Sequence, residues 1–171
     1  AGEDPCRLLD PQVRSRIDSI EHDPSRRDAL AYLATTAEGK PIELRRELID
    51  ADLVLPIGCF RNGARWGDFG VSGVVFPTFS SAATLSRFYS AKTLDARGRR
   101  RKRLTREADE AAWLLGANFA IQAIPGPGES VLGVVAGEIG AVRRAARGAY
   151  AAAWRRAVPR RAELVVAAIE G

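Results

Sequence analysis

Short runs of β-branched and other apolar residues alternate with amphipathic stretches along most of the chain. This alternation is typical of an α/β fold, in which strands form one layer and helices cover it. We therefore expect a single α/β domain over residues 1–171, with a mostly parallel sheet, one hairpin and helices on both faces. At 46% hydrophobic and 27% charged residues, the composition suits a globular core and excludes collagen-like and disordered chains.

The spacing of apolar residues predicts the individual elements. Helices are expected over residues 27–37, 45–51, about 80–92, 105–116 and 138–157, with Ser80 or Ser81 and Thr105 as N-caps. Strands are expected over residues 42–44, 52–58, 118–124, 131–136 and 163–169. The strands at 118–124 and 131–136 are separated by a proline- and glycine-rich turn, which predicts a hairpin. The continuous apolar run at 52–58 predicts a strand buried on both faces.

Several function classes find no support in the sequence. No apolar run approaches the length of a membrane span, and the N-terminus does not resemble a signal peptide, so a soluble, cytoplasmic protein is expected. Cys6 and Cys59 are far apart and are read as small apolar residues in a reducing compartment. With one histidine and two cysteines, the chain cannot build a standard cysteine zinc site, and no metal ligand is predicted.

Positive charge is concentrated in one segment. Without the seven basic residues between positions 97 and 106, the net charge of +5 becomes −2. Such a run could bind phosphates of nucleic acid or of a membrane surface, but no aromatic residue is interleaved for base stacking. A solvated loop is the expected reading. The seven residues are Arg97, Arg99, Arg100, Arg101, Lys102, Arg103 and Arg106.

A glycine-rich stretch at residues 58–79 follows the predicted strand at 52–58. Ligands of open α/β sheets bind beyond the carboxyl ends of strands, and long ordered loops there are commonly functional. Arg61 and Arg65 could hold a carboxylate or phosphate through paired hydrogen bonds, with Asp68 orienting one of them; a plain surface role for these three is the alternative. The other ligand-binding candidates in the stretch are Asn62, Gly67, Gly70 and Ser72.

Three stretches closely resemble the nickel-dependent lactate racemase family: residues 21–24, 30–42 and 51–58. The similarity continues at the family's spacing and covers about residues 18 to 171. It runs through Gly67, Gly70, Pro77 and Thr84, and returns at residues 118–121, 134–138 and 162–166.

The resemblance implies a fold and a chemistry. It identifies the chain as the later part of an α/β N-terminal domain in a longer protein that also has a second domain. In the family, a nickel-pincer nucleotide takes a hydride from C2 of a 2-hydroxy acid and returns it to either face, while two histidines exchange the hydroxyl proton. A lysine tethers the cofactor and another histidine ligates nickel. A 2-hydroxy acid or a nucleotide is the implied small-molecule partner.

The family's functional positions are substituted in this chain. The proton-transferring histidine falls at Gly63, the tethering lysine at Gly73 and the nickel-ligating histidine at Tyr89. The resemblance thus leaves two readings: a racemase-family domain with changed chemistry, or a catalytically inactive homologue that binds an anionic ligand or serves a structural role. His22, the one histidine, either contacts a ligand or orients a loop together with Asp23.

Overall fold

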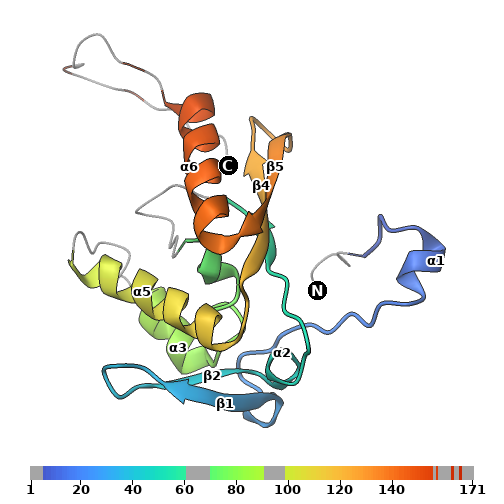
Figure 1. The fold of residues 1–171 in the computed structure, drawn as a ribbon, viewed down its shortest axis with the longest axis vertical. Coiled ribbons are helices and arrows are strands. Elements are labelled where there is room, and N and C mark those ends of the chain that lie inside the picture. The colour runs from blue at the N-terminus through green and yellow to red at the C-terminus, as the bar shows by residue number, and fades with distance from the viewer. Residues whose placement is uncertain are drawn as a thin grey trace.

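The computed structural model describes residues 6–60, 70–90 and 99–155, together with residues 157, 163 and 166 (Figure 1). The described elements belong to two packing units joined by the turn η2 (Val71–Val74). In chain order the others are α1 (Pro11–Arg14), η1 (Arg27–Ala29), β1 (Leu30–Thr35), β2 (Pro41–Arg45), α2 (Arg46–Ile49), β3 (Ile57–Cys59), α3 (Ala82–Phe88), α5 (Arg99–Leu114), β4 (Phe119–Pro125), β5 (Val131–Glu138) and α6 (Ile139–Trp154).

The first unit is the antiparallel pair β1–β2 covered by α3 and α5. Its core draws on all of these elements and on the segment after η2. Phe76 and Phe88 meet edge to face at its centre, with ring centroids 5.4 Å apart. The buried residues are Ile42, Leu44, Val75, Phe76, Phe88, Leu104, Ala108 and Ala111.

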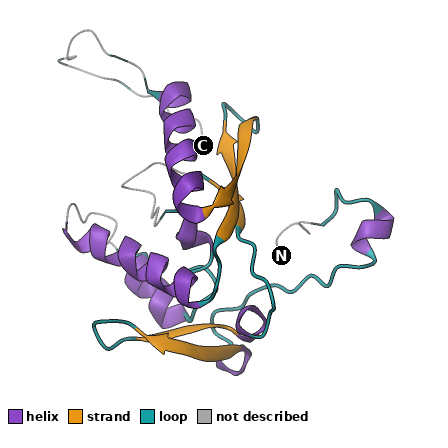
Figure 2. Cartoon of the chain, viewed as in Figure 1, coloured by secondary structure: helices purple, strands orange, loops and turns teal. Residues whose placement is uncertain are grey.

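The second unit is a three-stranded sheet in the order β3-β4-β5, with α6 lying along one face (Figure 2). β3 pairs with β4 in parallel, and β4 pairs with β5 as an antiparallel hairpin. Val71, Ala120 and Val142 form the small core between η2, the sheet and α6. Gly58 in β3 allows close contact with η2, because a Cβ there would lie only 2.5 Å from a methyl carbon of Val74.

The α/β class is confirmed, as are the hairpin and the helix that follows it. Glu138 is the N-cap of α6, and Ser81 is the N-cap of α3, where its hydroxyl accepts a hydrogen bond from the Thr84 N–H. The strand expected at 42–44 and the short helix after it are present as β2 and α2. Among the described residues one strand pairing is parallel and two are antiparallel, so the sheet is less parallel than expected.

Two predicted elements are wrong in type or extent. The helix expected over residues 27–37 is instead η1 followed by β1, because backbone pairing with β2 outweighs the helical spacing of Leu30 and Leu33. Of the strand expected over residues 52–58, only the end lies within β3, and Leu53 and Ile57 are exposed rather than covered on both faces.

The basic segment is also different from the expected loop. From Arg99 onward it forms the first turns of α5, since arginine, lysine and leucine favour helices. Thr105 therefore lies inside the helix and does not cap it. Of the strand expected over residues 163–169, all but Glu163 and Val166 lie outside the described residues, and Val166 is exposed. Within the described part of the chain, no helix is long and apolar enough to cross a membrane.

Candidate functional site

The turn η2 brings one of the predicted site residues, Ser72, to the junction of the two units. Gly70, just before the turn, has a φ of 80°, a conformation that residues with a side chain rarely adopt. Its carbonyl accepts a hydrogen bond from the Gly73 N–H at 3.0 Å, which closes the turn. Ser72 is buried and lies between α5 and α6.

Ser72 belongs to a polar cluster with Asp109 of α5 and Arg143 of α6. The Ser72 hydroxyl donates to Asp109 Oδ1 at 2.7 Å, and Arg143 Nη1 donates to Asp109 Oδ2 at 2.9 Å. Arg143 Nη2 completes the paired interaction with Asp109 Oδ1. Gly70 lies beside this guanidinium: a Cβ there would be in ordinary van der Waals contact with it at 3.6 Å, so the positive φ and not a lack of space favours glycine.

A second acid, Glu138, lies at the start of α6. Its two carboxylate oxygens accept hydrogen bonds from the N–H groups of Gly140 and Ala141, at 2.7 and 2.8 Å. These two backbone hydrogen bonds lower the pKa of Glu138, and the nearby charges of Arg144 and Arg143 add to the effect. The carboxylate therefore already occupies the N-terminus of α6, where an anion would otherwise be favoured.

Both acids border a pocket of about 260 Å³ between α5, α6 and η2. Trp113 forms one wall and is 71% exposed, which is unusual for so large an aromatic side chain. Ser72, Asp109, Asn118, Glu138 and Arg143 are the polar residues of the lining, and Ala112, Ala117, Ile139 and Gly140 complete it. The volume is slightly below the range of pockets that hold drug-sized ligands, so it suits a small molecule.

The chemistry available in this pocket is hydrogen bonding and charge pairing. Arg143 is matched by Asp109, and the Ser72 hydroxyl already donates to the same carboxylate. No histidine, cysteine or lysine is among the described residues that line it, so none of these can act as a proton shuttle or tether a cofactor. The arrangement can bind and orient a ligand through Asn118, Arg143 and the Trp113 ring.

The structure brings only part of the predicted site together. Ser72 lines the pocket, whereas Gly70 precedes the same turn and Gly73 lies within it, both outside the lining. Tyr89 is the C-cap residue of α3 and also lies outside it. The remaining predicted positions fall outside the described residues: Arg61, Asn62, Gly63, Arg65, Gly67 and Asp68.

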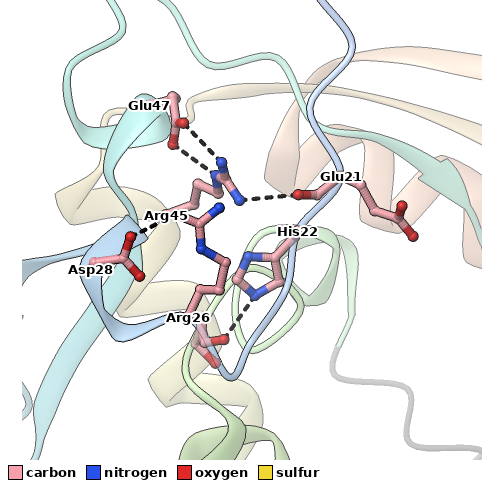
Figure 3. A network of polar contacts seen from close by, with 7 residues as sticks. Glu21, His22, Arg26, Asp28, Arg45 and Glu47 are labelled. Carbon is pink, nitrogen blue, oxygen red and sulfur yellow. Dashed lines mark hydrogen bonds and ion pairs between the residues drawn. The ribbon is translucent and has the colours of Figure 1, made fainter.

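His22 is used to hold a loop. Its Nε2–H donates to the Ser80 carbonyl at 2.9 Å (Figure 3). Its ring meets Phe79 edge to face, with ring centroids 5.6 Å apart. Asp23 accepts a hydrogen bond from the Ser25 N–H at 2.9 Å and so shapes the turn that follows. Of the two readings of His22, the structure supports loop orientation.

The loop is fixed further by the neighbouring Arg45. Its guanidinium binds both carboxylate oxygens of Glu47, at 2.8 and 2.9 Å, and donates to the Glu21 carbonyl at 3.0 Å (Figure 3). The interaction with Arg45 lowers the pKa of Glu47 to about 2. These contacts attach the N-terminal segment to the end of β2.

Sequence reasoning missed most of the pocket. Asp109 and Arg143 are 34 positions apart and carry no local signal that they meet. Glu138 could have been found, because an acid directly before a long alanine-rich helix is a typical N-cap. Trp113 fits the apolar spacing of an ordinary helix, so nothing in the sequence indicates that it lines a pocket.

The described residues do not fit a bound nickel cofactor. They contain no group of three or more histidine, cysteine, aspartate or glutamate side chains that could hold a metal ion. The side chain of His22 is committed to Ser80, and Gly73 offers no side chain at all.

Comparison with known proteins supports the fold alone. No family model matches the chain, and no curated protein does. Among solved structures, the lactate racemase apoprotein from Thermoanaerobacterium thermosaccharolyticum is similar, with a TM-score of 0.61 and 16% identity over 73% of this chain. The match spans 31% of the racemase chain. The protein thus has a lactate racemase-like fold corresponding to about a third of that enzyme.

Proposed function

We propose that this chain is a divergent lactate racemase-like domain of a longer protein in the 2-hydroxyacid racemase and epimerase family. In this proposal the domain keeps the fold and binds a small ligand, but it does not itself supply the family's proton-transfer, tethering and nickel-binding groups. The observation that carries the proposal is the fold similarity to the racemase apoprotein over 73% of the chain.

The side chains at the described family positions support the loss of the original chemistry. Gly73 can offer only its backbone, and its N–H is already used to close η2. A tyrosine phenol at position 89 is a poor replacement for a neutral imidazole as a ligand of nickel. His22, the one histidine of the sequence, holds a loop instead of facing the pocket.

Nickel content and bound mass test this proposal. The full-length product of the gene that encodes this chain, here called the whole-gene protein, is expressed together with the enzymes that make the nickel-pincer nucleotide. The Thermoanaerobacterium racemase is the positive control. We expect substoichiometric nickel, an intact mass without a nucleotide adduct and no interconversion of D- and L-lactate. Stoichiometric nickel with a covalent adduct would overturn the proposal.

The alternative is a domain that retains racemase activity through residues supplied elsewhere in the protein. A thermal-shift screen with lactate, other 2-hydroxy acids and nucleotides separates binding from catalysis. If the domain binds at the pocket, a stabilising ligand should lose its effect in Arg143→Met. A ligand that still stabilises this variant would show that the pocket is not its site.

A further inference from the structure

One face of the β3-β4-β5 sheet is apolar, and no described element covers it. Side chains alternate between the two faces of a strand, and Gly58, Gln122 and Val135 point toward η2 and α6. The intervening residues point the other way. They include Ile57, Cys59, Phe119, Ile121, Val134 and Ala136.

These residues form a continuous surface across all three strands. Ile57 pairs with Ile121, which pairs in turn with Ala136, and Cys59 pairs with Ala123, which pairs with Val134. Ile57 is 65% exposed, Phe119 57% and Val134 63%. Soluble monomers rarely expose so contiguous an apolar patch, and larger ones commonly mark interaction sites.

The parallel pair β3–β4 makes the open face more unusual. Sheets with parallel strands are normally covered on both faces, because the crossover connections place helices there. Here α6 lies along one face, and α5 contacts η2 on that same side (Figure 1). No described element covers the other face.

The N-terminal arm shows the same feature. It extends on the side of the sheet away from α6 (Figure 1). Its helix α1 buries no residue, and Leu8, Val13, Ile17 and Ile20 are all exposed. Two apolar surfaces without a described covering element therefore lie on one side of the molecule, which favours an additional layer there.

We propose that the uncovered sheet face is an internal interface, covered by an apolar helix layer from a further region of the same protein. This rests on the proposed function in one respect, the longer lactate racemase-like protein. The match accounts for 31% of the racemase chain, so more than two thirds of that fold has no counterpart here. A second copy of this chain is the competing occupant.

Cys59 reports on this face directly, because it is exposed in β3. The experiment compares alkylation of Cys59 by N-ethylmaleimide in the native and the urea-unfolded whole-gene protein, read by peptide mass spectrometry. Light scattering on the same sample gives the oligomeric state. We expect Cys59 to react at least about tenfold more slowly in the native monomer, as local opening of a buried site requires free energy.

A pair of lysine substitutions keeps the test independent of the thiol. Val134→Lys places a charge on the proposed interface, whereas Ala149→Lys places one on an exposed position of α6. We expect the first to lower the melting temperature of the whole-gene protein by more than about 5 °C and the second to leave it nearly unchanged.

Three outcomes would overturn the proposal. The first is rapid alkylation of Cys59 together with an unchanged melting temperature in Val134→Lys. The others are protection of Cys59 only in a dimer, and a reading frame that ends with these 171 residues. None of these readouts depends on nickel, nucleotide or lactate. A protected face in a protein that carries stoichiometric nickel and a covalent nucleotide adduct would refute the proposed function and leave the interface intact.

Discussion

The two packing units solve the burial of apolar surface differently. In the first, β1–β2 and the helices α3 and α5 enclose a core in which Phe76 and Phe88 are fully buried. In the second, α6 covers one face of the β3-β4-β5 sheet and the other face is open. The first unit encloses its core between described elements, whereas in the second no described element covers one face of the sheet.

This contrast between an enclosed core and an exposed sheet face separates buried residues that stabilise the fold from exposed residues that are available for contacts. Phe76 and Phe88 of the first unit are buried against each other, while the ring of Phe119 in the second unit is 57% exposed. The pocket lies where the two units meet, so its polar cluster both joins them and remains accessible to a small molecule. Substitutions in the two units should therefore have clearly different effects.

The largest contrast is expected between two phenylalanines. Phe88→Ala should lower the free energy of unfolding by about 3–5 kcal/mol, because it leaves a cavity against Phe76. Phe119→Ala in the same 171-residue chain should cost less than about 1 kcal/mol, since its ring is already more than half exposed. Urea unfolding of both variants measures the difference. Equal losses would show that the sheet face is covered within the chain itself.

A smaller effect is expected at the ion pair between α3 and α5. Glu107 is almost fully buried and its carboxylate is bound by Arg87 in a paired geometry. Arg87→Met should cost about 3 kcal/mol, because it leaves a buried carboxylate without that partner. Arg26→Met, which breaks the exposed pair with Asp28, is the matched control and should have little effect on the urea midpoint.

The ion pair between Arg143 and Asp109 at the pocket should contribute less to the free energy of unfolding than the pair between Arg87 and Glu107. Arg143 and Asp109 are each about one quarter to one third exposed, so water screens their attraction. Arg143→Met is expected to cost about 1 kcal/mol in urea unfolding. A loss as large as that for Arg87→Met would mean that the cluster is mainly a structural joint.

The smallest effect is an acid-pH dependence of stability, expected at two carboxylates that are bound in the folded chain. Glu47 and Glu138 both have lowered pKa values, so each stabilises the fold above its unfolded-state pKa of 4.5 and loses that contribution as the pH falls through its folded value. For Glu47 the loss is spread between pH 4.5 and about 2. Glu47→Gln and Glu138→Gln should each flatten the acid limb of the melting temperature against pH. An unchanged acid limb in Glu138→Gln would argue against its role as the α6 cap.

The sequence predicted several elements from local signals, although Thr105 was wrongly expected to cap a helix. Ser81 before α3, Glu138 before α6 and the turn between β4 and β5 are short-range patterns, and the predicted elements are present. Residues 30–35 were misread because their apolar spacing suits either a helix or a strand. Backbone pairing with β2 makes these residues a strand, and that pairing cannot be inferred from residues 30–35 alone.

The site was harder to predict for the same reason. Ser72 was a candidate because it lies in the glycine-rich stretch, and it does line the pocket. Its partners Asp109 and Arg143 come from two helices far along the chain, so only the packing of η2, α5 and α6 reveals them. The substituted positions Gly73 and Tyr89 were visible in the sequence, but their separation from the pocket was not.

Gly58 has a consequence for how this protein can vary. Any methyl group at that position would collide with Val74 and also press on the amide of Gln122. β3 and η2 would then have to move apart. Ser72, two residues before Val74, would move away from the Asp109 carboxylate to which its hydroxyl donates. A single missing carbon atom thus sets the spacing between β3 and η2 next to the pocket.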